Sequence, residues 1–151
     1  MSYYREDLSQ YGNDFIYQVD RPSDDVRNVG WIDTTHPYNK WIPPEWFLDA
    51  LYIACRHKVN LKRSYDHCRL CGALASPYPL SADRFSRKVA LGDGEIRVRG
   101  QGIVHASPDL IYHYVEVHGY RPPDEFISCL QKRKYLSRAW LYKVLARLHR
   151  R

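Results

Sequence analysis

The sequence predicts a small α+β domain in which a β-hairpin and the helix after it are joined by a zinc site of two cysteines and two histidines. The chain has 151 residues, which fits a single domain with its own core. Residues 95–99 alternate in the period of a half-buried strand, and a helical pattern follows after Ser107. An amphipathic helix at the C-terminus completes the predicted fold.

The first half of the chain predicts few regular elements. Residues 1–30 are polar and predict irregular structure with one short strand near 15–17, and residues 28–32 predict a short buried strand. Residues 43–55 predict a helix, because a first helical turn tolerates proline and the apolar residues that follow recur at helical spacing. Residues 73–88 contain two prolines and several small residues, and they predict a loop.

The second half predicts a hairpin followed by a helix. Residues 100–102 turn the strand 95–99, and residues 103–106 return beside it. Ser107 is expected to cap a helix that has Pro108 in its first turn and runs through residues 110–118. Gly119 is placed to end this helix, and a second short helix is expected to start at residue 123.

The C-terminal segment differs in charge from the rest of the chain. Residues 131–151 contain eight basic and no acidic residues, and subtracting them from the net charge of +6 leaves −2 for residues 1–130. Apolar residues of this segment fall on one face of a helix. The sequence therefore predicts a zinc-stabilised α+β domain over 1–130 and a basic C-terminal helix over 131–151.

Two cysteines and two histidines form a candidate metal site. Cys68 and Cys71 are separated by two residues, and His113 and His118 lie downstream in the predicted helix. Thiolate sulfur and neutral imidazole nitrogen suit Zn²⁺ in a structural site. A separation of five positions between the histidines turns about 140° past one face of a regular helix. The helix must therefore loosen near its end for both rings to reach one ion.

Other cysteines and histidines leave alternatives for this site. His67 flanks the cysteine pair, and His105 on the predicted strand could substitute for one of the helix histidines. Cys55 and Cys129 lie in apolar helical surroundings and are expected to be small buried residues.

Three stretches, residues 4–11, 28–38 and 94–126, resemble one family. It is a family of small uncharacterised bacterial proteins that start with Y-F-x-D-L-x-x-Y and continue with N-V-G-W-L-D-x-x-H-P-F. They contain a Cys-x2-Cys and close with H-Y-[IV]-x-x-H-x-Y-x-P-P-x-E-F. The resemblance covers residues 3–128 and leaves out the basic tail. It implies a bacterial origin and supports the metal ligands, but it supplies no reaction.

Catalytic signatures are weak in this sequence. Asp33 and His36 could form an acid–base pair, although the pattern favours a loop that Asp33 caps. Glu95 and Glu116 could serve as bases beside a catalytic metal. Four protein ligands, however, leave no open position for water, and a catalytic zinc generally keeps one. The sequence has no helical His-Glu-x-x-His pair and no phosphate-binding glycine loop.

These observations predict a non-enzymatic protein-interaction protein of the bacterial cytoplasm, in concrete form an immunity protein that neutralises a toxin. Because the first residues are polar and no stretch approaches roughly 20 apolar residues, we expect neither a signal peptide nor a transmembrane segment. The alternatives are a nucleic-acid-binding regulator that uses the basic helix and a zinc-dependent hydrolase. The residues expected to bind the partner are Lys132, Arg133, Lys134, Arg138 and Trp140.

Overall fold

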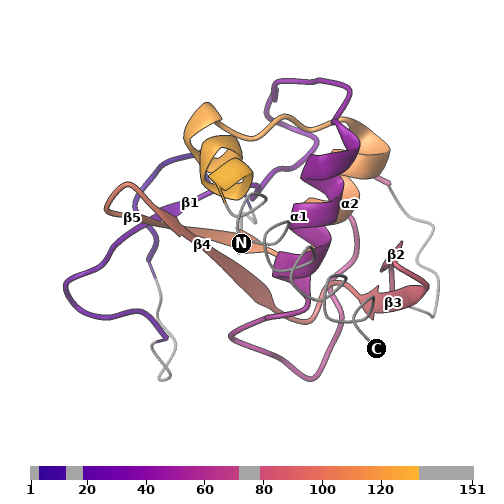
Figure 1. The fold of residues 1–151 in the computed structure, drawn as a ribbon, viewed down its shortest axis with the longest axis horizontal. Helices are drawn as coiled ribbons and strands as arrows, with labels where there is room; N and C mark the ends of the chain where they lie inside the picture. The colour runs from indigo at the N-terminus through magenta and orange to yellow at the C-terminus, as the bar shows by residue number, and fades with distance from the viewer. Residues whose placement is uncertain (1–3, 13–18, 72–78, 133–151) are drawn as a thin grey trace, which may run out of the picture.

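The computed structural model describes residues 4–12, 19–71 and 79–132 of the chain (Figure 1). In chain order the elements are β1 (Asp25–Asn28), α1 (Glu45–Cys55), β2 (Ser81–Arg84), β3 (Arg87–Ala90), β4 (Glu95–Gly100), β5 (Ile103–Pro108) and α2 (Ile111–His118). Residues 124–132 are also helical. Separate strands and helices make this a small α+β fold, as the sequence predicts.

A three-stranded sheet with the order β1-β5-β4 forms the centre of the fold. The hairpin predicted from the sequence is its antiparallel pair β4–β5, and β1 adds parallel to β5. The turn residues Gln101 and Gly102 have φ values of 55° and 74°. Such left-handed pairs match the twist of the strands in a two-residue hairpin.

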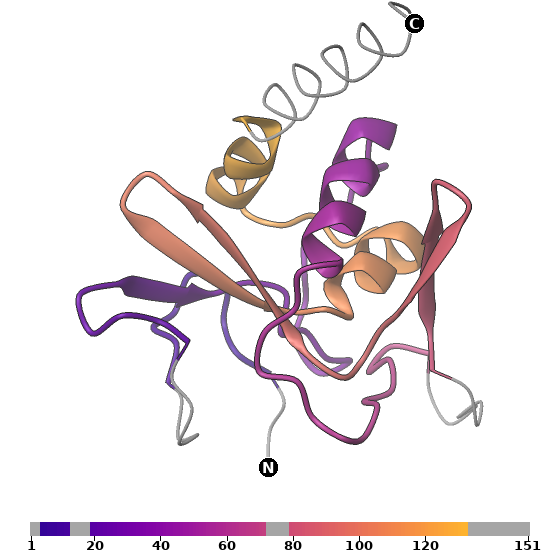
Figure 2. The same cartoon turned by 60° about the horizontal axis from the view of Figure 1, so that its bottom comes forward.

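α1 and α2 lie between the main sheet and a second, two-stranded sheet formed by β2 and β3 (Figure 2). α1 contacts α2, β4 and β2, so it links both sheets. Its buried face includes Phe47, Leu51 and Tyr52, each fully buried, and each such side chain contributes about 2 to 3 kcal/mol to stability. Cys55 and Cys129 are buried, as expected from the sequence.

The helix of residues 124–132 closes the core over one end of the β4–β5 hairpin (Figure 2). Phe126 of this helix is fully buried and its ring lies 6.4 Å from that of Phe47. Gly100 makes the close approach possible, because a Cβ there would lie 2.5 Å from Sγ of Cys129. The short helix predicted to start at residue 123 is therefore confirmed.

The predicted strand over residues 28–32 is wrong in its position. The strand β1 covers Asp25–Asn28. After it, the N–H of Val29 still donates to the carbonyl of Ala106 in β5, at 3.0 Å. Gly30 has a φ of 84° and turns the chain away from the sheet. Residues 29–32 are nonetheless buried. The apolar pattern therefore indicated residues of the core, but not residues paired in a strand.

The predicted loop over residues 73–88 is wrong in its second half, where β2 and β3 form a hairpin. The turn of this hairpin consists of Phe85 and Ser86, with φ values of 54° and 59°. Hairpin turns of this geometry usually contain Asn-Gly or Asp-Gly, so Phe-Ser gave no turn signal. Residues 72–78 lie outside the described part of the chain.

The predicted cap of the helix after β5 is also wrong. Ser107 and Pro108 belong to β5, where Ser107 pairs with Ile96, and α2 begins at Ile111 after Leu110. Pairing with β4 has therefore taken precedence over the local capping signal. The end of the helix is as predicted, since Gly119 adopts the left-handed conformation.

Two further predictions lie outside the described residues, namely the strand near 15–17 and the helix after residue 132. Within the described residues, no helix is long and apolar enough to cross a membrane.

Candidate metal centre

Four side chains that the sequence singled out lie around one point. The ligand atoms of Cys68, Cys71, His113 and His118 all lie within 4.8 Å of one another, so this group could hold a metal ion. The cysteines belong to the long connection between α1 and β2, and the histidines belong to α2. The cluster therefore joins segments that are 42 to 50 residues apart in the chain.

A tight turn, here called the knuckle (residues 68–71), brings the two thiols together. The backbone N–H groups of Leu70 and Cys71 each lie 3.3 Å from Sγ of Cys68 and donate to it. Burial raises the pKa of the Cys68 thiol to about 11, while these two hydrogen bonds act in the opposite direction and favour the thiolate. Gly72, which follows the knuckle, lies outside the described residues.

The last turn of α2 positions both imidazoles. The N–H groups of Gly119 and Tyr120 both bond to the carbonyl of Tyr114, so this turn is wider than that of a regular α-helix. The wider turn brings the rings of His113 and His118 to a centroid distance of 5.1 Å. The loosening that the five-residue spacing required is therefore present.

The sulfur and nitrogen atoms of the four side chains lie close together. Sγ of Cys71 lies 3.3 Å from Nε2 of His113 and 3.2 Å from Nε2 of His118. Sγ of Cys68 lies 3.3 Å from the same nitrogen of His118. The two ring planes are inclined at 68°, so the imidazoles approach the thiols from different directions. Nε2 of both histidines therefore lies close to Sγ of Cys71, and Nε2 of His118 also lies close to Sγ of Cys68.

The centre has a buried side and an exposed side. Cys68 is 7% exposed and His113 9%, whereas His118 is half-buried and Cys71 is exposed. Burial, with a smaller contribution from His118, lowers the pKa of His113 to about 4. Burial and the charge of Lys40 lower the pKa of His118. Both imidazoles are therefore neutral at pH 7, the form that binds a metal.

The segment before the knuckle lies along the loop between β3 and β4. The N–H of Lys62 donates to the carbonyl of Asp93 at 2.8 Å, and the N–H of Asp66 donates to the carbonyl of Gly92 at 2.7 Å. Gly92 has a φ of 107°, and a Cβ at this position would lie 2.4 Å from the carbonyl oxygen of Asp66. A glycine is therefore needed at position 92 for the segment to lie this close.

A family model matches residues 3–131 and describes a domain of unknown function, DUF7919. The chain belongs to this family. No curated protein and no solved structure matches the chain. DUF7919 membership supports the resemblance to an uncharacterised family and supplies no ligand, reaction or partner. The chemistry of the centre therefore has to be argued from its own residues.

Neither alternative histidine of this DUF7919 domain lies in the cluster. His67 is exposed beside the knuckle. His105 is 1% exposed on β5, its Nδ1 lies 3.0 Å from the carbonyl oxygen of Val98, and its ring lies 5.7 Å from that of Phe126. Burial lowers the pKa of His105, which is therefore a neutral core residue.

The residues expected to bind a partner lie at or beyond the end of the described chain. Lys132 is exposed at the end of the helical residues 124–132. The others lie outside the described residues, and their role stays a prediction: Arg133, Lys134, Arg138 and Trp140.

The pair Asp33 and His36 lies on an exposed loop. Nδ1 of His36 is 2.8 Å from Oδ1 of Asp33, and the same oxygen accepts the backbone N–H groups of Thr35 and His36 at 3.1 and 3.2 Å. Tyr4 stacks on the imidazole at a centroid distance of 3.6 Å. One carboxylate oxygen thus closes a turn, which is the loop role that the sequence favours.

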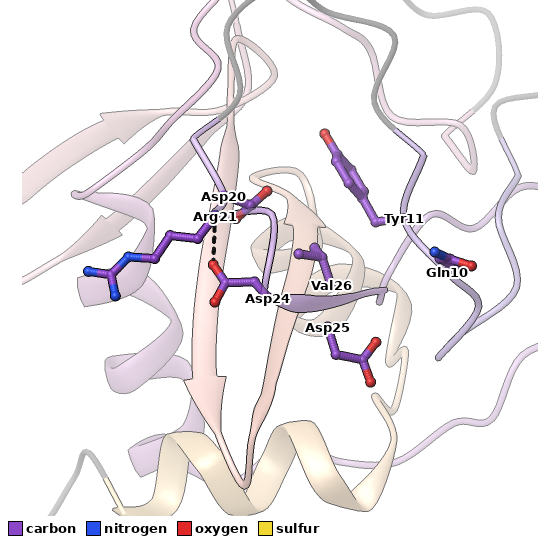
Figure 3. Close-up of a pocket in the computed structure, with 7 residues that line it drawn as sticks. All are labelled: Gln10, Tyr11, Asp20, Arg21, Asp24, Asp25 and Val26. Carbon is purple, nitrogen blue, oxygen red and sulfur yellow. Dashed lines mark hydrogen bonds between the residues drawn. The ribbon is translucent and has the colours of Figure 1, made fainter.

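A small polar pocket beside β1 was missed by sequence reasoning (Figure 3). Its volume is about 160 Å³, and it is lined by Gln10, Tyr11, Asp20, Arg21, Asp24, Asp25 and Val26. Asp20 pairs with Arg97 at 3.0 Å and Asp24 with Arg99 at 3.3 Å. The arginines that alternate along β4 are the sequence pattern that could have indicated this pocket. Because these carboxylates already have cationic partners, the pocket offers less chemistry than the metal centre.

Proposed function

We propose that Cys68, Cys71, His113 and His118 bind one Zn²⁺, and that this ion holds the knuckle to α2 in a non-enzymatic protein-interaction protein. The observation that carries the proposal is the convergence of two thiols and two imidazoles within 4.8 Å. Thiolate and neutral imidazole are the ligands that zinc prefers in structural sites.

The distances between the ligand atoms fit this ion. Zinc–sulfur bonds of about 2.3 Å and zinc–nitrogen bonds of about 2.1 Å, at tetrahedral angles, place sulfur and nitrogen about 3.6 Å apart. Three of the four sulfur–nitrogen distances here are 3.2 to 3.3 Å. These three distances therefore need to lengthen by only about 0.3 to 0.4 Å to accept zinc at ordinary bond lengths.

A structural ion has more support than a catalytic one. Four protein ligands complete a tetrahedral shell, whereas a catalytic zinc generally keeps one position for water or substrate. Glu116, a candidate base, accepts the hydroxyl of Tyr112 at 2.8 Å and lies 3.9 Å from Arg84. The zinc-dependent hydrolase is therefore the weaker proposal.

The proposed partner is a protein with an acidic surface, such as a toxin that the protein neutralises. The eight basic residues of 131–151, without any acidic residue, support a partner of opposite charge. Nucleic acid is the rival partner, and it predicts binding that falls steeply between about 50 and 200 mM salt. Binding to a DNA duplex that falls with salt in this way, and that is lost when residues 131–151 are deleted, would favour nucleic acid over the protein partner.

Mass spectrometry under native conditions tests the zinc site directly. Full-length protein purified without chelator is expected to carry one zinc ion per chain, because thiolate and imidazole ligands of structural sites bind zinc tightly at pH 7. Cys68→Ser should lose the ion, while His67→Ala should retain it, since His67 lies outside the cluster. Protein that contains no metal and takes up none from added zinc would contradict the proposal.

A further inference from the structure

The two thiols of the metal centre differ sharply in access. Cys68 is 7% exposed, and its sulfur accepts two backbone N–H groups of the knuckle. Cys71 is exposed at the outer side of the centre. Cys55 and Cys129 are 0% and 2% exposed. Of the four cysteines, all among the described residues, Cys71 is therefore the one that a reagent in water can reach.

Coordination would make this exposed thiol a thiolate at neutral pH. A thiol bound to a cation is deprotonated, and the thiolate is the form of cysteine that attacks electrophiles. Hydrogen bonds donated to a sulfur withdraw charge from it, and Cys68 accepts two of them. Access and hydrogen bonding therefore both make Cys68 the less reactive sulfur.

We propose that Cys71 is a site of oxidation by hydroperoxides, and that its oxidation releases the metal by joining Cys71 to Cys68. This inference rests on the proposed zinc site. The Sγ atoms of both cysteines belong to the group of atoms that lie within 4.8 Å of one another. The thiol of Cys68 therefore lies close to the oxidised sulfur of Cys71. Two residues separate the cysteines, a spacing that allows a disulfide to close within the knuckle.

The reaction proceeds in two balanced steps. The Cys71 thiolate attacks one oxygen of hydrogen peroxide, so an S–O bond forms, the O–O bond breaks and hydroxide leaves. The sulfur loses two electrons and becomes a sulfenic acid, while the peroxide is reduced. The Cys68 thiolate then attacks this sulfur, so the S–S bond forms, the S–O bond breaks and a second hydroxide leaves. Each hydroxide takes a proton from the solvent.

Oxidation would remove both sulfur ligands at once. Only His113 and His118 would remain, and both lie on α2, so no ligand would connect the knuckle to that helix. Two imidazoles alone hold zinc far more weakly than a set of four ligands. The attachment of the knuckle to α2 would thus depend on the redox state of Cys71.

Limited alkylation of the full-length zinc protein tests the first part of this inference. The zinc content is measured first, and N-ethylmaleimide is then added below one equivalent. Peptide mapping is expected to show Cys71 modified at least about tenfold faster than Cys68, because access and thiolate character control the rate. Protein that binds no zinc overturns the proposed function and this inference together. Protein that binds zinc but shows equal rates at the two cysteines overturns only the inference.

Titration with hydrogen peroxide tests the second part. One equivalent should release one zinc ion per chain to a coloured chelator and produce a peptide with a Cys68–Cys71 disulfide, which dithiothreitol reverses. Cys71→His keeps four ligands without the exposed thiolate and should retain zinc under the same peroxide dose. Cys55→Ala, a buried thiol outside the cluster, should release zinc like the unchanged protein. Zinc release from Cys71→His at the unchanged rate would overturn the inference.

Discussion

The segment from Lys58 to Cys71 is fixed at its two ends by different chemistry. At the first end, the Lys58 ammonium contacts Asp93 at 2.5 Å, Asp109 at 3.2 Å and the carbonyl of Ala90 at 2.6 Å. At the other end, two thiols meet two imidazoles. The first attachment is formed by side-chain and backbone groups of the protein itself, whereas the second is a cluster that could hold a metal ion. The difference predicts that metal controls one end of the segment and leaves the other in place.

The ion pair at the Lys58 end is strongly buried. Asp109 is 1% exposed and its carboxylate also accepts the N–H of Gly92 at 2.8 Å. Burial raises the pKa of Asp109 to about 6, although Gly92 and Lys58 both act to lower it. Burial lowers the pKa of Lys58, but the hydrogen bonds to Asp93 and Asp109 outweigh it and raise the pKa. Both partners are therefore charged at pH 7.

Removal of the metal is expected to have the largest effect. Structural zinc contributes about 10 kcal/mol or more of binding free energy, and a chelator removes this contribution. Hydrogen exchange of the chelated protein should show loss of protection at the N–H groups of Leu70 and Cys71, which bond to Cys68. The N–H of Val59, bonded to the carbonyl of Glu95 at 2.8 Å, should stay protected. Equal loss of protection at both ends would contradict the prediction that metal controls only one end of the segment.

Replacing Lys58 by methionine tests the other attachment. The substitution keeps an apolar stem but leaves the buried Asp109 carboxylate without its cation, which costs about 3 to 5 kcal/mol of unfolding free energy. Chemical denaturation measures this loss, and native mass spectrometry should still find one zinc ion. The matched control is Lys62→Met, because Lys62 pairs with Asp66 near the surface, with side chains 46% and 31% exposed. The control should cost less than about 1 kcal/mol, and equal losses in the two variants would contradict the burial argument.

The buried carboxyl also predicts a dependence on pH. The pKa of Asp109 rises from 3.8 in the unfolded chain to about 6 in the folded protein, so the folded state binds the proton more tightly. The stability gained from this proton is complete below pH 3.8 and is lost as pH rises to about 6. Asp109→Asn removes the titration. The unfolding free energy of the unchanged protein, relative to this variant, should fall by about 2 to 3 kcal/mol over that range. If the unfolding free energies of the two proteins change with pH in parallel, the prediction for Asp109 is wrong.

The sequence predicted the four residues of the candidate metal centre because each half of the set, a Cys-x2-Cys pair and two histidines on one helix, is a recognisable pattern by itself. Residue type and spacing were sufficient for Cys68, Cys71, His113 and His118, and Gly119 marked the helix end. The attachment at Lys58 was missed because Lys58 and Asp109 are ordinary charged residues, and such a pair leaves no pattern in the sequence.

The two hairpins show the same limit for the fold. The β4–β5 hairpin was predicted because its strands alternate and its turn contains Gly102. The β2–β3 hairpin was missed because its turn residues, Phe85 and Ser86, are rarely found in the left-handed conformation. The cap at Ser107 failed for another reason, as strand pairing with β4 removed the residue from the helix. Tertiary contacts thus overrode local preference at these positions.

The smallest expected effect comes from changing the second turn residue of each hairpin. Ser86 has a φ of 59° and Gly102 one of 74°, so both occupy the same position in turns of the same hand. A residue with a Cβ costs roughly 1 to 2 kcal/mol in this conformation, partly offset by the greater freedom of glycine in the unfolded chain. Ser86→Gly should therefore stabilise the protein by about 0.5 to 1 kcal/mol, as thermal unfolding can measure.

The matched variant Gly102→Ala should change stability by a similar amount in the opposite direction. A Cβ at Gly102 would have open space among the described residues, so the backbone conformation alone sets the cost. Ser86→Gly also keeps Phe85, whose ring lies 5.6 Å from that of Tyr52, and so leaves this contact unchanged. Opposite signs in the two variants, with the zinc content unchanged, would show that the β2–β3 turn stores strain that the β4–β5 turn avoids. Destabilisation by Ser86→Gly would mean that the Ser86 side chain contributes more than its backbone conformation costs.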